Sequence, residues 1–153
     1  MAAYIPNFMS EPLAQGLALL DYLPHRPPII LVDALLEATV QSAISCFTIQ
    51  DSTLFIQDGR FQPAGLLENM AQTVALSAGW QAPAHESPSV GYLVLIKNAQ
   101  IHGCPTIGTT INTHIEVQHQ LGTLTVVQGR VYQADEVLAE AQLTFTQQAK
   151  EAS

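Results

Sequence analysis

Charged residues are scarce in this sequence of 153 residues. Only 12% of them are Asp, Glu, Lys or Arg, about half the share of an average soluble domain. Five lysines and arginines stand against thirteen acidic residues, which gives a formal net charge of −8. Nucleic-acid binding depends on a basic surface and is therefore not expected, nor is docking on anionic membranes. So little charge also predicts that much of the surface lies against another subunit.

Cysteines and long apolar runs are scarce too. Cys46 and Cys104 are too few for a disulfide framework or a metal site, and we expect both to be small, buried apolar side chains. No pair of histidines has metal-ligand spacing on one element, so a metal site is not expected. No cofactor is expected either. No apolar run has the length of a membrane span, and the first residues lack the pattern of a secretory signal. These absences predict a cytoplasmic protein.

The longest apolar segment runs from Phe61 to Trp80 and reads FQPAGLLENMAQTVALSAGW. Its apolar residues recur every three or four positions, which predicts a buried helix. The expected buried stripe consists of Leu67, Met70, Ala71, Val74 and Ala78. Pro63 suits the first turn of this helix, and Gly79 suits a C-terminal cap.

Glu68 is the single formal charge between Arg60 and Glu86. Its carboxylate could oppose the positive end of the helix dipole or pair with Arg60. Alternatively, an apolar cleft could raise the pKa of this carboxyl, so that it acts as a general acid or base near neutral pH. Gln72 lies four residues further on, on the same helix face, and could orient the carboxyl by a hydrogen bond. Glu68 and Gln72 are therefore the candidate catalytic residues.

Strand patterns surround this helix. Before it, apolar residues predict strands over residues 29–32 and 38–50, the second with Val40, Ile44 and Phe47 facing inward. After it, apolar and polar residues alternate in a way that predicts four strands joined as hairpins, over residues 91–101, 111–118, 123–132 and 137–145.

A sheet that covers an apolar helix has to curl around it. We therefore expect an α+β fold of the hotdog type, a curled antiparallel sheet wrapped around one long central helix. No internal repeat or second domain is visible, so residues 1–153 should form a single domain. Residues 1–10 should form an N-terminal arm, and residues 147–153 a frayed tail.

Three stretches resemble the 3-hydroxyacyl-acyl-carrier-protein dehydratases of the FabZ and FabA type. Residues 23–33 (LPHRPPIILVD), 65–72 (GLLENMAQ) and 96–108 (IKNAQIHGCPTIG) look like the family's opening motif, its central-helix motif and its strand-and-turn motif, in that order. The helix motif, with no histidine before it, also resembles a divergent branch, the dehydratase-like subunit of aryl-polyene-type biosynthesis. In that branch the subunit is found beside a complete dehydratase.

In these dehydratases a histidine removes a proton from C2 of the acyl thioester, and a carboxylic acid on the helix helps the 3-hydroxyl to leave. The two residues meet across a dimer interface. The resemblance makes Glu68 the helix acid. The histidine position falls on Leu54, or on Phe55 if one gap is allowed, and neither side chain can accept a proton. Leu54 and Phe55 are instead expected to contact the substrate.

The resemblance also locates the group that binds the thioester carbonyl. The family uses a glycine N–H at the start of the helix, and Pro63 occupies that position here without an N–H to donate. The amides of Ala64 and Gly65 are the expected substitutes, because the first turn of a helix leaves donors free. The glycine of the family's pairing strand is replaced by Leu95.

Five histidines could replace the missing base. His25 belongs to the opening motif, where the resemblance implies a structural role. His102, His114 and His119 are expected on the surface. His85 lies in the loop after the helix and is the least implausible replacement.

Three functions remain open. The first is a weakly active dehydratase in fatty-acyl or polyene biosynthesis. The second is a dehydratase-like subunit without its own chemistry, and the third is a hotdog thioesterase in which Glu68 activates water. In each case we expect an acyl thioester, on an acyl carrier protein or coenzyme A. We also expect a homodimer, or a heterodimer with a related active dehydratase.

Overall fold

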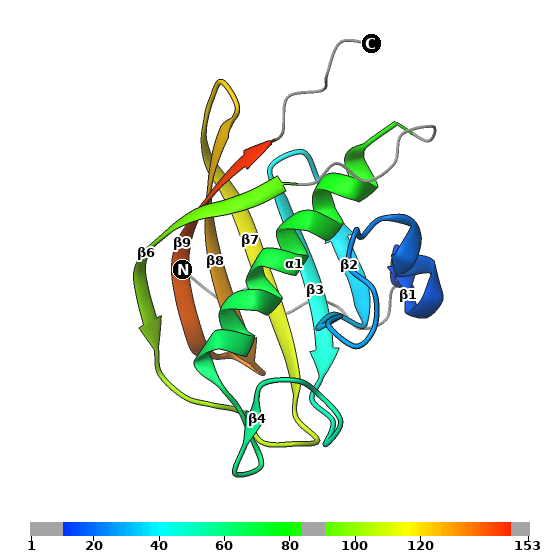
Figure 1. The fold of residues 1–153 in the computed structure, drawn as a ribbon, viewed down its shortest axis with the longest axis vertical. Coiled ribbons are helices and arrows are strands. Elements are labelled where there is room, and N and C mark those ends of the chain that lie inside the picture. The colour runs from blue at the N-terminus through cyan, green and yellow to red at the C-terminus, as the bar shows by residue number, and fades with distance from the viewer. Residues whose placement is uncertain (1–10, 84–90, 148–153) are drawn as a thin grey trace.

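An antiparallel sheet of seven strands curls around a long α-helix in the computed structural model, which describes residues 11–83 and 91–147 (Figure 1). Along the sheet the strands are β1 (Ala14–Gln15), β2 (Ala34–Ala38), β3 (Ser42–Thr48), β7 (Thr110–Leu121), β8 (Leu124–Gln133), β9 (Glu136–Gln147) and β6 (Gly91–Ile101). The helix α1 (Pro63–Gln81) crosses one face of the sheet and contacts β2, β3, β6, β7, β8 and β9. The predicted hotdog fold is confirmed.

Smaller elements complete the described chain. A 3₁₀-helix, η1 (Gly16–Asp21), follows β1, and the short strands β4 (Ile56–Gln57) and β5 (Arg60–Phe61) form a hairpin before α1. Gln147 is the last residue of β9, so the first residue of the predicted tail is ordered in the sheet. The predicted arm and the remainder of the tail lie outside the described residues. Within the described residues no helix is long and apolar enough to cross a membrane.

The helix buries one face against the sheet. The buried residues of α1 are Gly65, Leu66, Asn69, Met70, Gln72, Thr73, Leu76 and Ser77. The predicted stripe is wrong in part, because Met70 is buried while Leu67, Ala71 and Val74 are half-buried and Ala78 is exposed. A helix that is apolar on nearly every side has no clear direction of burial. Polar residues, which hydrogen-bond to the surrounding strands and loops, define its orientation instead.

Asn69 is the centre of this buried polar row. Its Nδ2 donates to the carbonyl of Leu31 at 2.7 Å, and its Oδ1 accepts a hydrogen bond from the Thr113 hydroxyl. Thr73 donates to the Asn69 carbonyl at 2.8 Å and exchanges a hydrogen bond of 2.7 Å with Ser45. Each such bond contributes about 1 kcal/mol net, and leaving one of these buried groups unpaired would cost more. The row therefore fixes the helix against β3, β7 and residues 29–31.

Residues 22–33 cross α1 and form no strand, so the predicted strand over residues 29–32 is wrong. Side chains of the helix take the place of a strand partner, since Asn69 and Gln72 bind the backbone of Ile29 and Leu31. At the other end of the crossing, a Cβ on Gly79 would lie 1.9 Å from the Tyr22 carbonyl oxygen. Gly79 therefore permits a close approach and does not cap the helix, which ends at Gln81.

The strand predicted over residues 38–50 is not continuous, because this range contains the last residue of β2, a turn, and β3. Val40 lies in the turn between β2 and β3 and is 83% exposed, so its inward assignment is wrong. Thr39 stabilises this turn, because its hydroxyl accepts from the amides of Gln41 and Ser42. Phe47 is buried in the core as predicted, whereas Ile44 lines the opposite face of the sheet.

Strand β6 forms one edge of the sheet and pairs with β9 alone among the described strands (Figure 1). Every one of its residues is exposed. Six of them are large and apolar: Tyr92, Leu93, Val94, Leu95, Ile96 and Ile101. A long apolar edge strand is a template for pairing with another chain. This strand is therefore the part of the described surface most suited to a subunit interface.

Candidate active site

Glu68 lies in the second turn of α1 with about one third of its side chain exposed (32%). Gln72 Nε2 donates to Glu68 Oε1 at 3.0 Å, which is the hydrogen bond expected from their spacing. Arg60 is not the partner of this carboxylate, because its guanidinium donates to the Cys104 carbonyl at 2.9 Å. The carboxyl group is thus oriented by a neutral amide and remains accessible to a substrate.

Gln72 is fully buried and holds more than the carboxylate. Its Oε1 accepts from the Leu31 amide at 2.7 Å, and its Nε2 donates to the Ile29 carbonyl at 2.8 Å. One side chain therefore joins residues 29–31 to the carboxyl of Glu68. The same group therefore sets the position of the carboxyl and the position of residues 22–33, the crossing segment.

His25 enters the site from this crossing segment. Its Nε2 lies 3.9 Å from Glu68 Oε1, and 26% of its side chain is exposed. Arg26 stiffens the segment, because its Nη1 donates to the carbonyls of Leu23 and His25, both at 2.7 Å. Sequence reasoning gave His25 only a structural role. No spacing in the sequence indicated that it lies near Glu68, because the approach depends on the path of residues 22–33, which Gln72 holds on the helix.

Leu54 and Phe55 lie in the turn before β4 and are 37% and 38% exposed. Phe55 has a positive φ of 66°, a strained value for a bulky residue. The turn packs against the start of the helix, where a Cβ on Gly65 would lie 3.0 Å from the Phe55 Cβ and still closer to the ring of Phe61. The structure therefore places Leu54, Phe55 and the first turn of α1 together.

The helix N-terminus differs from the prediction in one respect. The Gly65 amide already donates to the Gln62 carbonyl at 2.9 Å, so it is not a free donor for a thioester carbonyl. Gln62 precedes Pro63, and its carbonyl also accepts from Leu66. Ala64 is exposed and remains the candidate donor at this end of the helix.

The other described histidines lie away from Glu68. His102 and His119 are exposed, as predicted, and His85 lies outside the described residues. His114 is half-buried on the outer face of the sheet, and its ring packs on Tyr132 with 4.7 Å between ring centroids. Burial lowers the pKa of His114, and Glu37 and Arg130 shift it in opposite directions. Its predicted location on the open surface is therefore wrong.

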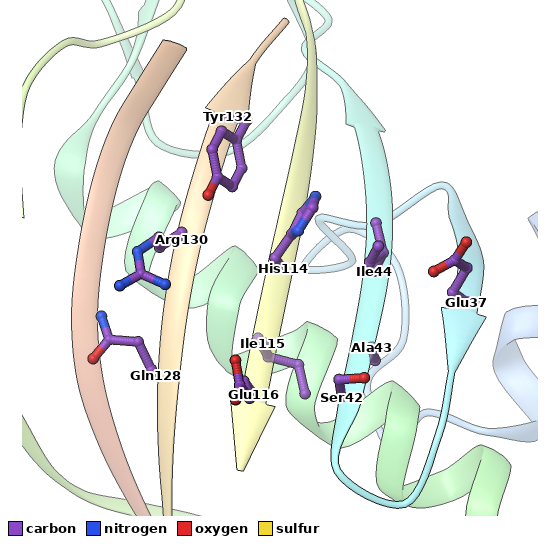
Figure 2. Close-up of a pocket in the computed structure, with 10 residues that line it drawn as sticks. All are labelled: Glu37, Ser42, Ala43, Ile44, His114, Ile115, Glu116, Gln128, Arg130 and Tyr132. Atoms are coloured by element: carbon purple, nitrogen blue, oxygen red, sulfur yellow. The ribbon is translucent and has the colours of Figure 1, made fainter. Parts of the chain in front are cut away.

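His114 lines a shallow hollow of about 260 Å³ on the side of the sheet away from α1. Figure 2 shows Tyr132, Arg130 and Gln128 from β8 beside His114 and Glu116 from β7, with the helix behind the sheet. A second, apolar hollow of about 220 Å³ lies between η1 and residues 27–30. Neither hollow contains any of the predicted site residues. Glu68 lines neither of them, and about one third of its side chain is exposed in the single chain.

The cysteines and acidic residues that the structure describes form no further centre. Cys46 and Cys104 are half-buried rather than buried, and they are not bonded to each other. Burial, with a smaller contribution from Asp33, raises the pKa of the Cys46 thiol, which keeps it protonated and unreactive. Among the described residues, no three His, Cys, Asp or Glu side chains gather as they would around a metal ion.

Comparison with known families gives a match over most of the chain. The family model described as ApeP-like, ApeP dehydratase, matches residues 17–153. A 3-hydroxyacyl-[acyl-carrier-protein] dehydratase FabZ from Wolinella succinogenes is 28% identical over 134 residues, covering 80% of this chain and 88% of the relative. A FabZ from Nitratiruptor sp. is 25% identical over 131 residues, covering 79% of this chain and 88% of the relative.

Solved structures share the fold. A chain of the dehydratase heterocomplex ApeI:P from Xenorhabdus doucetiae has a TM-score of 0.78 and 21% identity, covering 86% of this chain and 91% of its own. The protein PH1136 from Pyrococcus horikoshii has a TM-score of 0.66 and 16% identity, covering 92% of this chain and 97% of its own. At these identities the likeness concerns the fold.

Proposed function

The chain belongs to the ApeP-like dehydratase family, and from this we propose that it acts in the dehydration of 3-hydroxyacyl thioesters in fatty-acyl or polyene biosynthesis. The substrate is carried by an acyl carrier protein or coenzyme A. The observation that carries the proposal is Glu68, a carboxyl that is 32% exposed and oriented by Gln72 on an otherwise uncharged helix. A dehydratase needs one acid in reach of the leaving hydroxyl, and Glu68 provides it.

Glu68 works in this proposal as a general acid. Its carboxyl gives a proton to the 3-hydroxyl, which departs as water while the C2 proton is removed by a base. Gln72 keeps the carboxyl in place, because its Nε2 donates both to Glu68 and to the Ile29 carbonyl. Leu54 and Phe55 supply no base, and loss of a positioned base typically lowers the rate about 10²–10⁴-fold. A base has to come from elsewhere in the site, and because Glu68 is partly exposed in the single chain, we expect weak activity from the isolated chain.

A related dehydratase subunit is the proposed partner. Edge strand β6 exposes Tyr92 and Val94 at 52% and 54%, and an apolar edge of this length suits pairing with an equivalent strand. The site is open in the single chain, so a second subunit would also close it. The similar ApeI:P structure is a dehydratase heterocomplex, which supports a related dehydratase as that subunit, and a second copy of this chain is the alternative.

The acyl chain is proposed to lie along Leu54 and Phe55 beside the first turn of α1. Both side chains are apolar and more than one third exposed in the single chain, which makes them available to a ligand. Each methylene buried there should contribute about 0.8 kcal/mol. Affinity should therefore rise with acyl length until the available surface is covered.

Co-expression with a complete, related dehydratase tests this function. The expected result is a stable heterodimer that converts a 3-hydroxyacyl-carrier-protein to its enoyl product faster than this chain does alone. Product analysis separates the alternatives. Release of free thiol without enoyl product would identify a thioesterase, in which Glu68 activates water. Failure of the two chains to copurify, together with no enoyl product from either preparation, would refute the proposal.

A further inference from the structure

His25 is the described titratable group nearest to Glu68, and it comes from the same chain. Its Nε2 lies 3.9 Å from Glu68 Oε1, the oxygen that also accepts from Gln72. Its Nδ1 is buried and has no hydrogen-bond partner among the described residues. Nδ1 therefore cannot exchange protons with solvent or substrate. Nε2 is the ring nitrogen available for proton transfer, and it faces the carboxyl.

We propose that His25 is the base that works with Glu68, in place of a histidine at Leu54 or Phe55. This inference rests on the proposed dehydration. The proton to be removed and the hydroxyl that leaves are on adjacent carbons of the substrate. An acid and a base a few ångströms apart can therefore serve both in one bound pose. The spacing of 3.9 Å between His25 and Glu68 meets this requirement.

The protons of the proposed reaction balance between His25 and Glu68. The imidazole Nε2 of His25 takes the C2 proton, the C2=C3 double bond forms, and the C3–O bond breaks. The leaving hydroxyl takes a proton from the Glu68 carboxyl and departs as water. The imidazolium then returns its proton to the Glu68 carboxylate, which restores both groups. No oxidant, reductant or further reactant is required.

The fold holds His25 at this place through groups other than the histidine. Arg26 bonds to the carbonyls on either side of Pro24, and the Ile29 amide donates to the Arg26 carbonyl at 3.2 Å. Gln72 then binds the carbonyl of Ile29 from the helix at 2.8 Å. The segment is thus ordered without using the His25 ring. A ring that is 26% exposed, beside an acid that is 32% exposed, is available to a substrate.

The test compares His25→Gln and His25→Ala with the wild-type chain, with His119→Gln as a control on an exposed histidine. The assay follows formation of the enoyl thioester from a 3-hydroxyacyl-N-acetylcysteamine thioester, by the chain alone and by its complex with the partner. We expect kcat to fall about 100-fold or more in both His25 variants with KM nearly unchanged. His119→Gln should match the wild type. Added imidazole should partly restore His25→Ala, a response that a structural role would not give.

The outcomes separate this inference from the proposed function. His25→Gln keeps an amide donor near Glu68 but cannot carry a proton, so activity within about threefold of wild type overturns the base assignment alone. If the wild-type chain is active only with its partner and the His25 variants match it there, the base is the partner's, and again only this inference fails. If neither preparation dehydrates the thioester, both the inference and the proposed function are refuted.

Discussion

Replacing Gln72 with methionine should destabilise the fold while leaving the volume of the side chain nearly unchanged. The variant keeps the packing of a fully buried residue but removes its hydrogen bonds to the Leu31 amide, the Ile29 carbonyl and Glu68. The Leu31 amide is then buried without a partner, at a cost of about 1–3 kcal/mol. The Ile29 carbonyl is half-buried and can turn to water, so its loss should add about 1 kcal/mol or less.

The expected sum is a loss of about 1–4 kcal/mol in the free energy of unfolding. Urea denaturation at fixed protein concentration measures it, because dimer formation would make apparent stability depend on concentration. Gln81→Met, at the exposed end of the same helix, is the matched control and should change stability by less than about 0.5 kcal/mol. A loss for Gln72→Met as small as that of the control would refute the reasoning that this side chain holds residues 29–31 on the helix.

Three further results follow from particular contacts. Gly79→Ala should lower the free energy of unfolding by about 1–2 kcal/mol in urea denaturation, because its Cβ would lie 1.9 Å from the Tyr22 carbonyl oxygen and the clash should outweigh the gain in helix propensity. A variant as stable as the wild type would contradict this close approach. Burial lowers the pKa of His114 from 6.5, so the unfolded chain binds more protons and stability should fall as pH drops below about 6.5. The melting temperature should show this fall, and His114→Gln should make it smaller. The same pH dependence of the melting temperature in both proteins would contradict the role of His114. In a His25→Gln background, Leu54→His should restore part of the lost dehydration by supplying a base at the position expected from the family, and adding Glu68→Gln should remove the gain; a gain that survives without Glu68 would count against its role as the acid.

The architecture could be predicted from the sequence because its signals are local. The alternation in residues 91–145 predicted the four strands after the helix, and the observed β6 has the predicted bounds. The apolar run predicted α1 within two residues at each end. Residues 29–32 were misassigned because an apolar run of this length has the same pattern whether its hydrogen bonds go to a strand or to side chains. Here they go to Asn69 and Gln72.

The candidate site was predictable only where spacing along the helix determined it. Glu68 and Gln72 are four residues apart and form the expected hydrogen bond of 3.0 Å. His25 is distant from both in the sequence, and its approach to Glu68 depends on the path of the crossing segment. A periodic pattern of apolar residues gives no information about the path of such a segment. For the same reason, sequence alone did not show that the Gly65 amide is occupied by the carbonyl of Gln62.

The most direct test of the account is the rate at which the heterodimer, with Glu68→Gln in this chain, dehydrates a 3-hydroxyacyl-carrier-protein. Each turnover in this chain's site needs a proton from the Glu68 carboxyl, which an amide cannot supply. The comparison requires a partner whose own helix acid has been replaced, so that only this chain's site contributes. With that partner, the rate should fall about 100-fold or more for Glu68→Gln and stay unchanged for Glu136→Gln, an exposed acid at the start of β9. An unchanged rate for Glu68→Gln would contradict the account.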